Sequence, residues 1–377
     1  MVSSNKYYLL HISKYSFPSK GGVENYVESL LINNSKFQST VISNSRDYNS
    51  SIINNNGVKY IKLKTWFFIK SQPISFGTKT LRKELIQSNL VHLHFPYPTI
   101  EILFFLLFPF LKKTKVIITY HANPKKTRWK SFSLFYSLLN NFIFKIADRI
   151  IITSKKNLIS SNIPEEYWHK SVVLPIGIKL DKGELNLVSK TFPNRRMRLL
   201  FVGQLRKYKG VQILIEALQH VDVELNIIGN GEMYDSLTSL INELDLKNRI
   251  SIHRNVNDEM LEQYYQNSDL FVLPSIDESE SFGIVQLEAL KYRLPIINTN
   301  LASGVTDVSI HDFTGITVSP NSVEQLTQAI NFILNNPSKY EYFSSNTEKQ
   351  IQKFEDIEIK KQYIRILEDC LNDIPPK

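Results

Sequence analysis

The sequence predicts an α/β protein of two domains, each built on a doubly wound parallel sheet. Apolar, strand-like runs alternate with amphipathic segments along the whole chain, which has 377 residues, 42% of them hydrophobic. This alternation is typical of parallel sheets covered by helices on both faces, and the length suits two ordinary domains. The composition is too apolar for a disordered chain and too poor in glycine and proline for a fibrous one.

The apolar runs give the expected strands in order. In the first half they are Tyr7–His11, Thr40–Ser43, Val58–Leu63, Leu90–Leu93, Val116–Thr119 and Arg149–Thr153. In the second half they are Leu199–Val202, Val223–Ile228, Ile250–Ile252, Leu270–Pro274 and Pro295–Asn298. After the first strand, apolar residues recur with the spacing of one helix face, at Val23, Tyr26, Val27, Leu30 and Leu31.

A polar stretch without periodicity separates the two halves. We expect an N-terminal domain at residues 1–180, a linker at 181–196 and a C-terminal domain at 197–355, with a last helix in 356–377 that returns to the first domain. Two such domains would face each other across a cleft at the carboxyl ends of their strands. The most apolar run, Ile102–Leu111, falls well short of the ~20 residues that span a bilayer, so we expect no membrane-spanning helix.

Charge is distributed unevenly between the halves. Residues 1–190 carry 27 Lys and Arg against 10 Asp and Glu, whereas residues 191–377 carry 18 against 26. A basic half favours an anionic partner, although lysines that only keep an aromatic-rich domain soluble are an alternative. One basic and aromatic stretch suits an acceptor site or the surface of an anionic membrane, and its residues include Lys125, Lys126, Arg128, Trp129 and Lys130. Aromatic residues that form ordinary helix core are the alternative. The single cysteine, Cys370, fits a reducing compartment.

Two glycines, Gly21 and Gly22, lie between the first strand and its helix. Glycine lets a backbone approach a ligand closely, and the N–H groups at a helix start suit an anion. A purely conformational role for the pair is the alternative. The chain has neither a complete Gly-rich dinucleotide fingerprint nor a P-loop signature.

Three cations, Arg206, Lys207 and Lys209, follow the strand Leu199–Val202 and precede a helix expected near Gly210. At the carboxyl end of a strand they are poorly placed for packing and well placed for a diphosphate. Each charge-assisted hydrogen bond of this kind contributes roughly 1.5–3 kcal/mol. A solvated basic loop is the alternative.

Two carboxylates, Glu280 and Glu288, follow a strand of the second half. We expect Ser279 or Ser281 to cap a helix that runs through Glu288, which leaves three backbone N–H groups for a ligand, those of Phe282, Gly283 and Ile284. Carboxylates so placed can accept hydrogen bonds from sugar hydroxyls. A glycosidase pair is the alternative, but a glycosidase has no use for a phosphate-binding basic loop.

Histidines accompany two strands of the first half. His121 follows the strand Val116–Thr119, where it would face a substrate, and a structural role is its alternative. His92 and His94 alternate along another strand. No His, Asp, Glu or Cys cluster has the sequence spacing of metal ligands, and no Asp-x-Asp pair is present to hold a divalent ion. We therefore expect neither a metal nor another cofactor.

Together these motifs resemble the family 4 retaining glycosyltransferases, whose fold, termed GT-B, has two Rossmann-like domains. The resemblance is nearly full length and includes Gly-Gly-Val-Glu-Asn, His-Phe-Pro-Tyr-Pro, Thr-Tyr-His and Ile-Gly-Asn-Gly-Glu. Its most specific element is a Glu-x7-Glu signature, which fits Glu280 and Glu288. The segments Ser281–Ala289 and Ser303–Val305 further resemble a branch that builds bacterial surface polysaccharides, often from GDP-mannose or related donors.

The resemblance implies a role for each matching residue. Donor-binding positions would be Gly22, Gly203, Arg206, Lys209, Gly229, Phe282, Gly283, Ile284 and Glu288. Lys209 would bind the diphosphate and Glu288 the ribose hydroxyls, while His121 and Glu280 would be the catalytic residues that contact the transferred sugar. Where the family usually has arginine this chain has Gln204, and we expect Arg206 to supply that charge.

The implied reaction moves a hexose from GDP-mannose or a UDP-sugar to a saccharide acceptor that is lipid-linked, with retention of configuration. The leaving phosphate would help to take the acceptor's proton, so Glu280 positions the sugar and is not a nucleophile. A sugar-nucleotide epimerase or hydrolase is the alternative enzyme. A nucleic-acid-binding protein is a further alternative, but no recognised motif supports a nucleic-acid partner. We expect a cytoplasmic protein attached peripherally to the inner face of the membrane.

Overall fold

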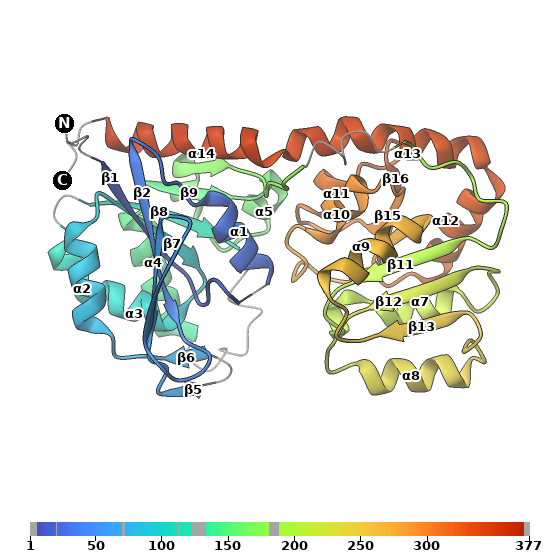
Figure 1. The fold of residues 1–377 in the computed structure, drawn as a ribbon, viewed down its shortest axis with the longest axis horizontal. Helices are drawn as coiled ribbons and strands as arrows, with labels where there is room; N and C mark the ends of the chain where they lie inside the picture. The colour runs from blue at the N-terminus through green and yellow to red at the C-terminus, as the bar shows by residue number, and fades with distance from the viewer. Residues whose placement is uncertain are drawn as a thin grey trace. The chain divides into compact units, whose positions relative to one another are not determined.

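A computed structural model describes residues 6–19, 21–69, 72–111, 114–121, 133–180 and 188–372. The chain forms two compact units (Figure 1): the first comprises Met1–Gly177 and Ile357–Lys377, and the second comprises Ile178–Asp356. Residues 188–196, which the sequence analysis placed in a linker, therefore fall within the second unit.

The first unit contains an eight-stranded sheet with the order β10-β9-β8-β7-β1-β2-β4-β3. All neighbouring strands are parallel except β3 and β4. The strands are β1 Tyr7–Ile12, β2 Phe37–Asn44, β3 Ser51–Asn55, β4 Val58–Leu63, β7 Leu90–Phe95, β8 Lys115–Tyr120, β9 Arg149–Ile152 and β10 Ser171–Val173, and a separate hairpin pairs β5 Phe67–Ile69 with β6 Gln72–Ile74.

Helices surround this sheet (Figure 1), and the last helix of the chain is one of them. They are α1 Gly22–Leu30, α2 Thr78–Gln87, α3 Pro98–Leu107, α4 Ser133–Ile146, α5 Lys155–Ile159 and α14 Asp356–Leu371, with single turns η1 Phe108–Phe110 and η4 Glu165–Lys170. Helix α1 buries Tyr26, Val27 and Leu30 against the sheet. Val23, which we expected on the same face, is exposed, and Leu31 lies just beyond the helix.

The second unit contains a six-stranded, fully parallel sheet with the order β13-β12-β11-β14-β15-β16. Its strands are β11 Arg198–Val202, β12 Glu224–Ile228, β13 Ile250–His253, β14 Leu270–Leu273, β15 Ile296–Thr299 and β16 Gly315–Val318. Its helices are η5 Lys207–Lys209, α7 Val211–Ala217, α8 Tyr234–Glu243, α9 Asp258–Asn267, α10 Val285–Lys291, α11 Val305–Val308, α12 Val323–Asn335, α13 Pro337–Ile351 and η6 Gln352–Phe354.

The doubly wound α/β fold predicted from the sequence is confirmed in both units. Central strands such as β7 and β14 are buried along their whole length, as expected of parallel strands covered on both faces. In each unit the strand order reverses direction once, between β1 and β7 in the first and between β11 and β14 in the second. Ligands of such sheets bind beyond the carboxyl ends of the strands at this switch point.

We searched the described part of the chain for a membrane-spanning helix. None of its helices combines the length and the apolar character that crossing a bilayer requires. The most apolar run of the sequence forms most of α3 together with η1.

Candidate functional site

The switch point of the first unit is lined by four histidines from three neighbouring strands. His11 lies on β1, His92 and His94 lie on β7, and His121 directly follows β8. His11 pairs with His92 in the sheet register, and the backbone N–H of His121 donates to the carbonyl of Phe95. The register thus brings together side chains that are more than a hundred residues apart in the sequence.

Three of these imidazoles form a continuous hydrogen-bonded chain. His121 Nε2 lies 3.1 Å from His94 Nδ1, and His94 Nε2 lies 3.2 Å from His11 Nδ1. His92 stands beside the chain, with its ring stacked on that of His94 at 4.4 Å between centroids. Sequence reasoning singled out His121, His92 and His94 separately and missed His11, because only strand pairing unites them.

Burial keeps these histidines neutral. It lowers the pKa of His11 to about 3 and that of His121 to about 4. The pKa values of His92 and His94 also fall well below 6.5, first through burial and then through the neighbouring imidazoles. A desolvated imidazole without an anionic partner is disfavoured in its charged form.

The glycine pair stands at the start of α1, the helix that follows β1 in the sequence. Gly21 precedes α1, and Gly22 is its exposed first residue. The basic and aromatic stretch that we assigned to an acceptor or a membrane, with Lys125, Lys126, Arg128, Trp129 and Lys130, lies outside the described residues.

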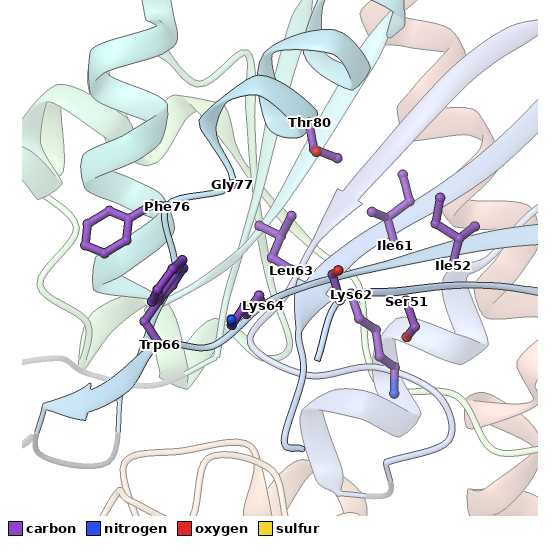
Figure 2. A pocket seen from close by; sticks show the side chains of 11 residues that line it. Ser51, Ile52, Ile61, Lys62, Leu63, Lys64, Trp66, Phe76, Gly77 and Thr80 are labelled. Atoms are coloured by element: carbon purple, nitrogen blue, oxygen red, sulfur yellow. The ribbon is translucent and has the colours of Figure 1, made fainter. Parts of the chain in front are cut away.

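A groove of about 630 Å³ lies in the same unit beside β3 and β4, at the β3 edge of its sheet (Figure 2). Trp66 and Phe76 line one side of it, and Ile52 and Ile61 line the other. Lys64 places its ammonium group 4.4 Å from the centre of the Trp66 ring. The groove is therefore apolar with a basic rim, and it is separate from the histidines described above, none of which lines it.

The switch point of the second unit carries a buried ion pair. Lys209 Nζ lies 2.5 Å from Glu280 Oε2, and both side chains are about nine-tenths buried. The hydroxyl of Ser275 donates to the same carboxylate oxygen at 3.0 Å. Lys209 follows β11 and Glu280 follows β14, so the two strands on either side of the reversal supply opposite charges to one point.

Gly210 allows these two loops to approach. It has a left-handed φ of 68°, and a Cβ atom there would lie 2.0 Å from the carbonyl oxygen of Pro274. Only glycine tolerates both conditions. Gly229 serves a similar contact, because its Cβ would lie 1.9 Å from the carbonyl oxygen of Gly203. The structure therefore gives Gly210 and Gly229 packing roles that sequence reasoning did not assign.

The pairing determines the charge of Lys209. Burial alone would lower its pKa, but the Glu280 carboxylate outweighs burial, so that the pKa of Lys209 is raised. Gln204 and Arg206 are both exposed. Arg206 lies near enough to oppose the pKa rise of Lys209, which places a second cation beside the pair.

The helix after Glu280 begins later than predicted. Helix α10 starts at Val285 with Ile284 as its N-cap residue and without a side-chain cap, because neither Ser279 nor Ser281 occupies the capping position. Glu288 consequently lies in the first turn and not deeper in the helix. The backbone N–H groups of Phe282, Gly283 and Ile284 lie in the preceding loop. None of the three donates a hydrogen bond to an acceptor among the described residues.

Glu288 has a partner that the sequence did not reveal. The hydroxyl of Tyr265, from α9, donates to Glu288 Oε2 at 2.6 Å. Burial raises the pKa of Glu288, and the Tyr265 hydrogen bond opposes this rise. One carboxylate oxygen of Glu288 is thus fixed by Tyr265.

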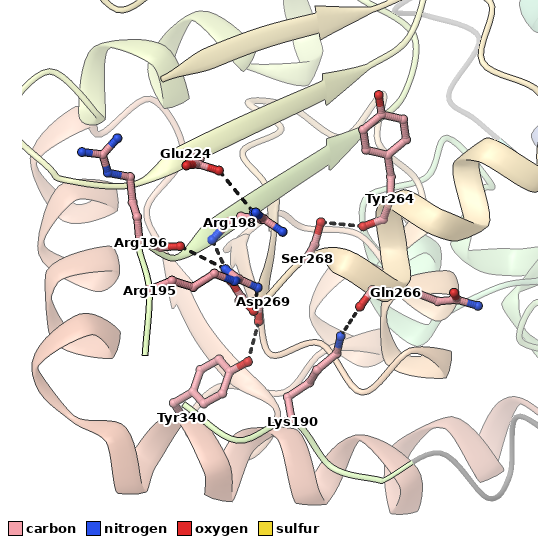
Figure 3. A network of polar contacts seen from close by, with 10 residues as sticks. All are labelled: Lys190, Arg195, Arg196, Arg198, Glu224, Tyr264, Gln266, Ser268, Asp269 and Tyr340. Atoms are coloured by element: carbon pink, nitrogen blue, oxygen red, sulfur yellow. Dashed lines mark hydrogen bonds and ion pairs between the residues drawn. The ribbon is translucent and has the colours of Figure 1, made fainter. Parts of the chain in front are cut away.

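A second group of charges lies at the opposite, amino end of the same sheet (Figure 3). Arg195 donates to both oxygens of Asp269, at 2.7 and 3.1 Å, and the backbone N–H of Arg198 donates to Asp269 Oδ2 at 2.8 Å. The hydroxyl of Tyr340 donates to the backbone carbonyl of Asp269. These contacts fasten the segment before β11 to the start of β14, so we regard this group as structural.

Comparisons with known proteins agree with this geometry. Residues 20–182 match the family model described as Glycosyltransferase Family 4, and residues 184–350 match Glycosyl transferases group 1. The chain is 28% identical to the D-rhamnosyltransferase WbpZ of Pseudomonas aeruginosa, over 92% of this chain and 91% of that protein. It is 25% identical to the O-antigen chain mannosyltransferase C of Escherichia coli, over 92% and 93%.

Solved structures share the fold. Sucrose-phosphate synthase from Thermosynechococcus elongatus superposes with a TM-score of 0.76 at 19% identity, covering 97% of this chain and all of that one. Anabaena HepE in complex with UDP-glucose gives a TM-score of 0.72 at 15% identity, covering 96% and 99%. These similarities confirm the GT-B fold that the sequence motifs imply.

Proposed function

The chain belongs to glycosyltransferase family 4, and from this premise we propose that it transfers a hexose from a nucleotide-diphosphate sugar to a saccharide acceptor in the synthesis of a bacterial surface polysaccharide. Its relatives WbpZ and mannosyltransferase C are named for transfers of this kind. The observation that carries the proposal is the buried Lys209–Glu280 pair at the switch point of the second unit.

The second unit offers one group for each part of such a donor. Lys209 binds the diphosphate, with Arg206 beside it as a further cation. Glu280 and the N–H groups of the Phe282–Ile284 loop hold the sugar, and Glu288, oriented by Tyr265, binds the ribose hydroxyls. Without a donor, Glu280 is the partner of Lys209, so the phosphate enters as a second anion for the same ammonium group. The sugar contact of His121, which lies in the first unit, stays a prediction from the family resemblance.

In the transition state, negative charge grows on the departing phosphate and positive charge on the sugar. Lys209 is fixed by its buried surroundings before reaction, so it stabilises the growing charge without reorganising. We propose retention of configuration, with the leaving phosphate assisting removal of the acceptor's proton and Glu280 positioning the sugar. Because Lys209 and Arg206 neutralise the diphosphate, we expect transfer to proceed without a divalent metal ion.

The first test is a thermal-shift screen of nucleotide sugars, including GDP-mannose and UDP-glucose. A donor that binds the native protein raises the melting temperature by mass action, and we expect this shift in wild type but not in Lys209→Met. Equal shifts in both proteins would contradict the proposed donor site.

The stabilising donor is then incubated with saccharide acceptors in the presence of EDTA. We expect consumption of donor that depends on acceptor and persists with EDTA. Complete consumption without acceptor would instead favour a hydrolase, and conversion to an isomeric donor would favour an epimerase. A glycosyl adduct trapped on Glu280 would overturn its positioning role.

We further propose that the acceptor is lipid-linked and that the first unit attaches peripherally to an anionic membrane. Large apolar side chains are exposed on two neighbouring parts of this unit, the segment from Trp66 to Phe76 and the segment α3–η1. The hydroxyl of Thr99 in α3 donates to the carbonyl of Pro73 in β6, which joins the two parts. Arg82 lies 4.1 Å from the centre of the Phe110 ring, so cations accompany these aromatic rings.

Vesicle flotation tests the membrane proposal. We expect binding to vesicles of anionic phospholipid at low salt, and its loss in the double variant Trp66→Ala/Phe76→Ala. The control is Phe332→Ala, which removes an exposed aromatic ring from α12 of the second unit. Failure of the wild type to float with anionic vesicles would overturn membrane attachment without affecting the transferase proposal.

A further inference from the structure

The hydrogen-bonded chain His121–His94–His11 runs from a partly exposed residue into the core of the first unit. His121 is partly exposed, whereas His94 and His11 are almost completely buried. The chain crosses the sheet from the end of β8 over β7 to β1, perpendicular to the strands. Burying a polar imidazole costs free energy, whereas burying an apolar side chain such as leucine is favourable. A row of buried histidines at this position therefore indicates a function.

Neutrality gives the chain a direction. Each neutral imidazole has one N–H donor and one acceptor nitrogen, so all hydrogen bonds of the chain point the same way. Within the described part of the chain, the charged or titratable groups that influence the pKa values of His92 and His94 are all imidazoles of the same cluster. Tyr26 from α1 and Tyr363 from α14 also pack here, and burial keeps both phenols neutral by raising their pKa values.

The buried end of the chain decides between the two directions. His11 Nε2 is buried and has no hydrogen-bond partner among the described residues. Buried N–H groups without an acceptor are rarer than unsatisfied acceptors, so this nitrogen carries the lone pair and His11 Nδ1 carries the proton. It follows that His11 donates to His94, and that His94 Nδ1–H donates to His121 Nε2.

His92 belongs to a different set of contacts. Its Nδ1 lies 2.6 Å from the Tyr363 hydroxyl and its Nε2 lies 2.7 Å from Thr119 Oγ1. Nitrogens of His11, His92 and His94 lie within 4.8 Å of one another, as in a metal site. However, both nitrogens of His92 and of His94 already have partners, and the two rings are stacked, whereas ligands of a zinc ion converge on one point.

We propose that His94, supported by His11, is a positioning residue that holds His121 as a neutral imidazole protonated on Nδ1. Because Nε2 of His121 accepts from His94, Nδ1 is the nitrogen left to contact a ligand, and it does so as a hydrogen-bond donor. The second nitrogen of a histidine fixes its tautomer in this way. The proposal rests on the proposed function in one respect, namely that the ligand of His121 is the transferred sugar.

The first readout is independent of activity. Long-range ¹H–¹⁵N correlation spectra of histidine-labelled protein report the tautomer of each imidazole, and a His121→Gln sample identifies the signals of His121. We expect the Nδ1–H form alone in wild type between pH 6 and 8, and a mixture of tautomers in His94→Phe. In His94→Asn the amide N–H replaces Nδ1–H as donor, and we expect the wild-type tautomer to be restored.

The second readout is the transfer rate. Losing one hydrogen bond that orders His121 should reduce kcat about tenfold in His94→Phe, with a smaller change in donor KM, and His94→Asn should recover most of the rate. The matched control is His92→Phe, which removes an equally buried, stacked imidazole outside the chain. We expect it to leave the His121 tautomer unchanged and kcat within twofold.

Several results would overturn the proposal. These are a wild-type His121 signal that is protonated on Nε2 or that is charged at pH 7, an equal loss of kcat in His92→Phe and His94→Phe, and stoichiometric zinc that disappears in His11→Phe. The wild-type spectrum decides the tautomer even if a variant fails to fold. An Nδ1–H His121 in a protein inactive with every donor would reject the proposed function and retain the positioning role.

Discussion

At the switch point of the second unit, Lys209 and Glu280 bring opposite charges within 2.5 Å of each other, whereas the switch point of the first unit carries imidazoles that burial keeps neutral. Both points arise from the same reversal of strand order. In the second unit the Glu280 carboxylate is the counter-charge of Lys209, and it raises the pKa of Lys209 despite burial. Among the described residues of the first unit, no carboxylate influences the pKa values of the four histidines, so burial there removes charge.

Strand order therefore determines where each site lies, and the side chains at that position determine its chemistry. A charged pair suits a ligand that is itself charged, such as a diphosphate. A neutral, ordered imidazole suits a hydroxyl group, which needs a directed hydrogen bond and no counter-charge. The second switch point therefore suits the charged diphosphate of the proposed donor, and the first suits a neutral hydroxyl group.

The largest effect is expected from breaking the charged pair. Lys209→Met leaves Glu280 buried without its counter-charge, which should lower the free energy of unfolding by about 3–5 kcal/mol and abolish transfer. The double variant Lys209→Met/Glu280→Gln should regain much of that stability while remaining inactive. Urea denaturation and the transfer assay measure both quantities.

Lys207→Met is the matched control for this prediction. Lys207 belongs to the same turn but is exposed, so its removal should change neither stability nor rate appreciably. If Lys209→Met were as stable and as active as Lys207→Met, the buried pair would have no part in the site.

A smaller effect is expected from the neutral side of the comparison. The unfolded chain binds a proton at each histidine below pH 6.5, whereas native His11, with a pKa of about 3, does not. The unfolded state thus binds more protons, and stability falls as pH drops from 6.5 toward 3. In that pH window, each such histidine lowers the free energy of unfolding by about 1.4 kcal/mol for every unit that the pH falls.

His11→Phe should therefore reduce the slope of unfolding free energy against pH by about one proton between pH 6 and 4.5. Denaturation curves at several pH values provide the slopes. An unchanged slope in His11→Phe would mean that His11 is protonated in the native protein.

The smallest effect is expected from an ion pair away from both switch points. Arg195→Gln removes the bidentate contact with Asp269 at the amino end of the second sheet (Figure 3). Because Arg195 is 43% exposed and Asp269 keeps the Arg198 N–H, we expect a loss of about 0.5–1 kcal/mol and an unchanged kcat. A large loss of activity would contradict the structural role that we give to the Arg195–Asp269 pair at the amino end of the sheet.

Much of the fold could be predicted from local patterns. Every expected strand is present to within a few residues, because central parallel strands are long apolar runs. The strands that were missed are short or lie at sheet edges: β3, β5, β6, β10 and β16. β5 has only three residues and is exposed throughout. A run this short, with no buried face, lacks the periodicity by which a strand is recognised in a sequence.

The site was only partly predictable for a different reason. Lys209, Glu280 and Glu288 stand in motifs that can be recognised locally. Their partners do not, since Tyr265 reaches Glu288 from another helix and His11 reaches His94 across paired strands. The start of α10 was misplaced because serines suggested a cap, whereas Gly283, with a left-handed φ of 72°, lets the loop continue to Ile284.

The hydrogen bond between His92 and Tyr363 joins residues that are 271 positions apart. The first unit is therefore assembled from both ends of the chain, while the second is one uninterrupted segment. Domains usually fold in the order in which the ribosome releases them. Here we expect the reverse: residues 178–356 can complete their fold first, because the first unit acquires its last helix only after residues 357–371 have also been synthesised.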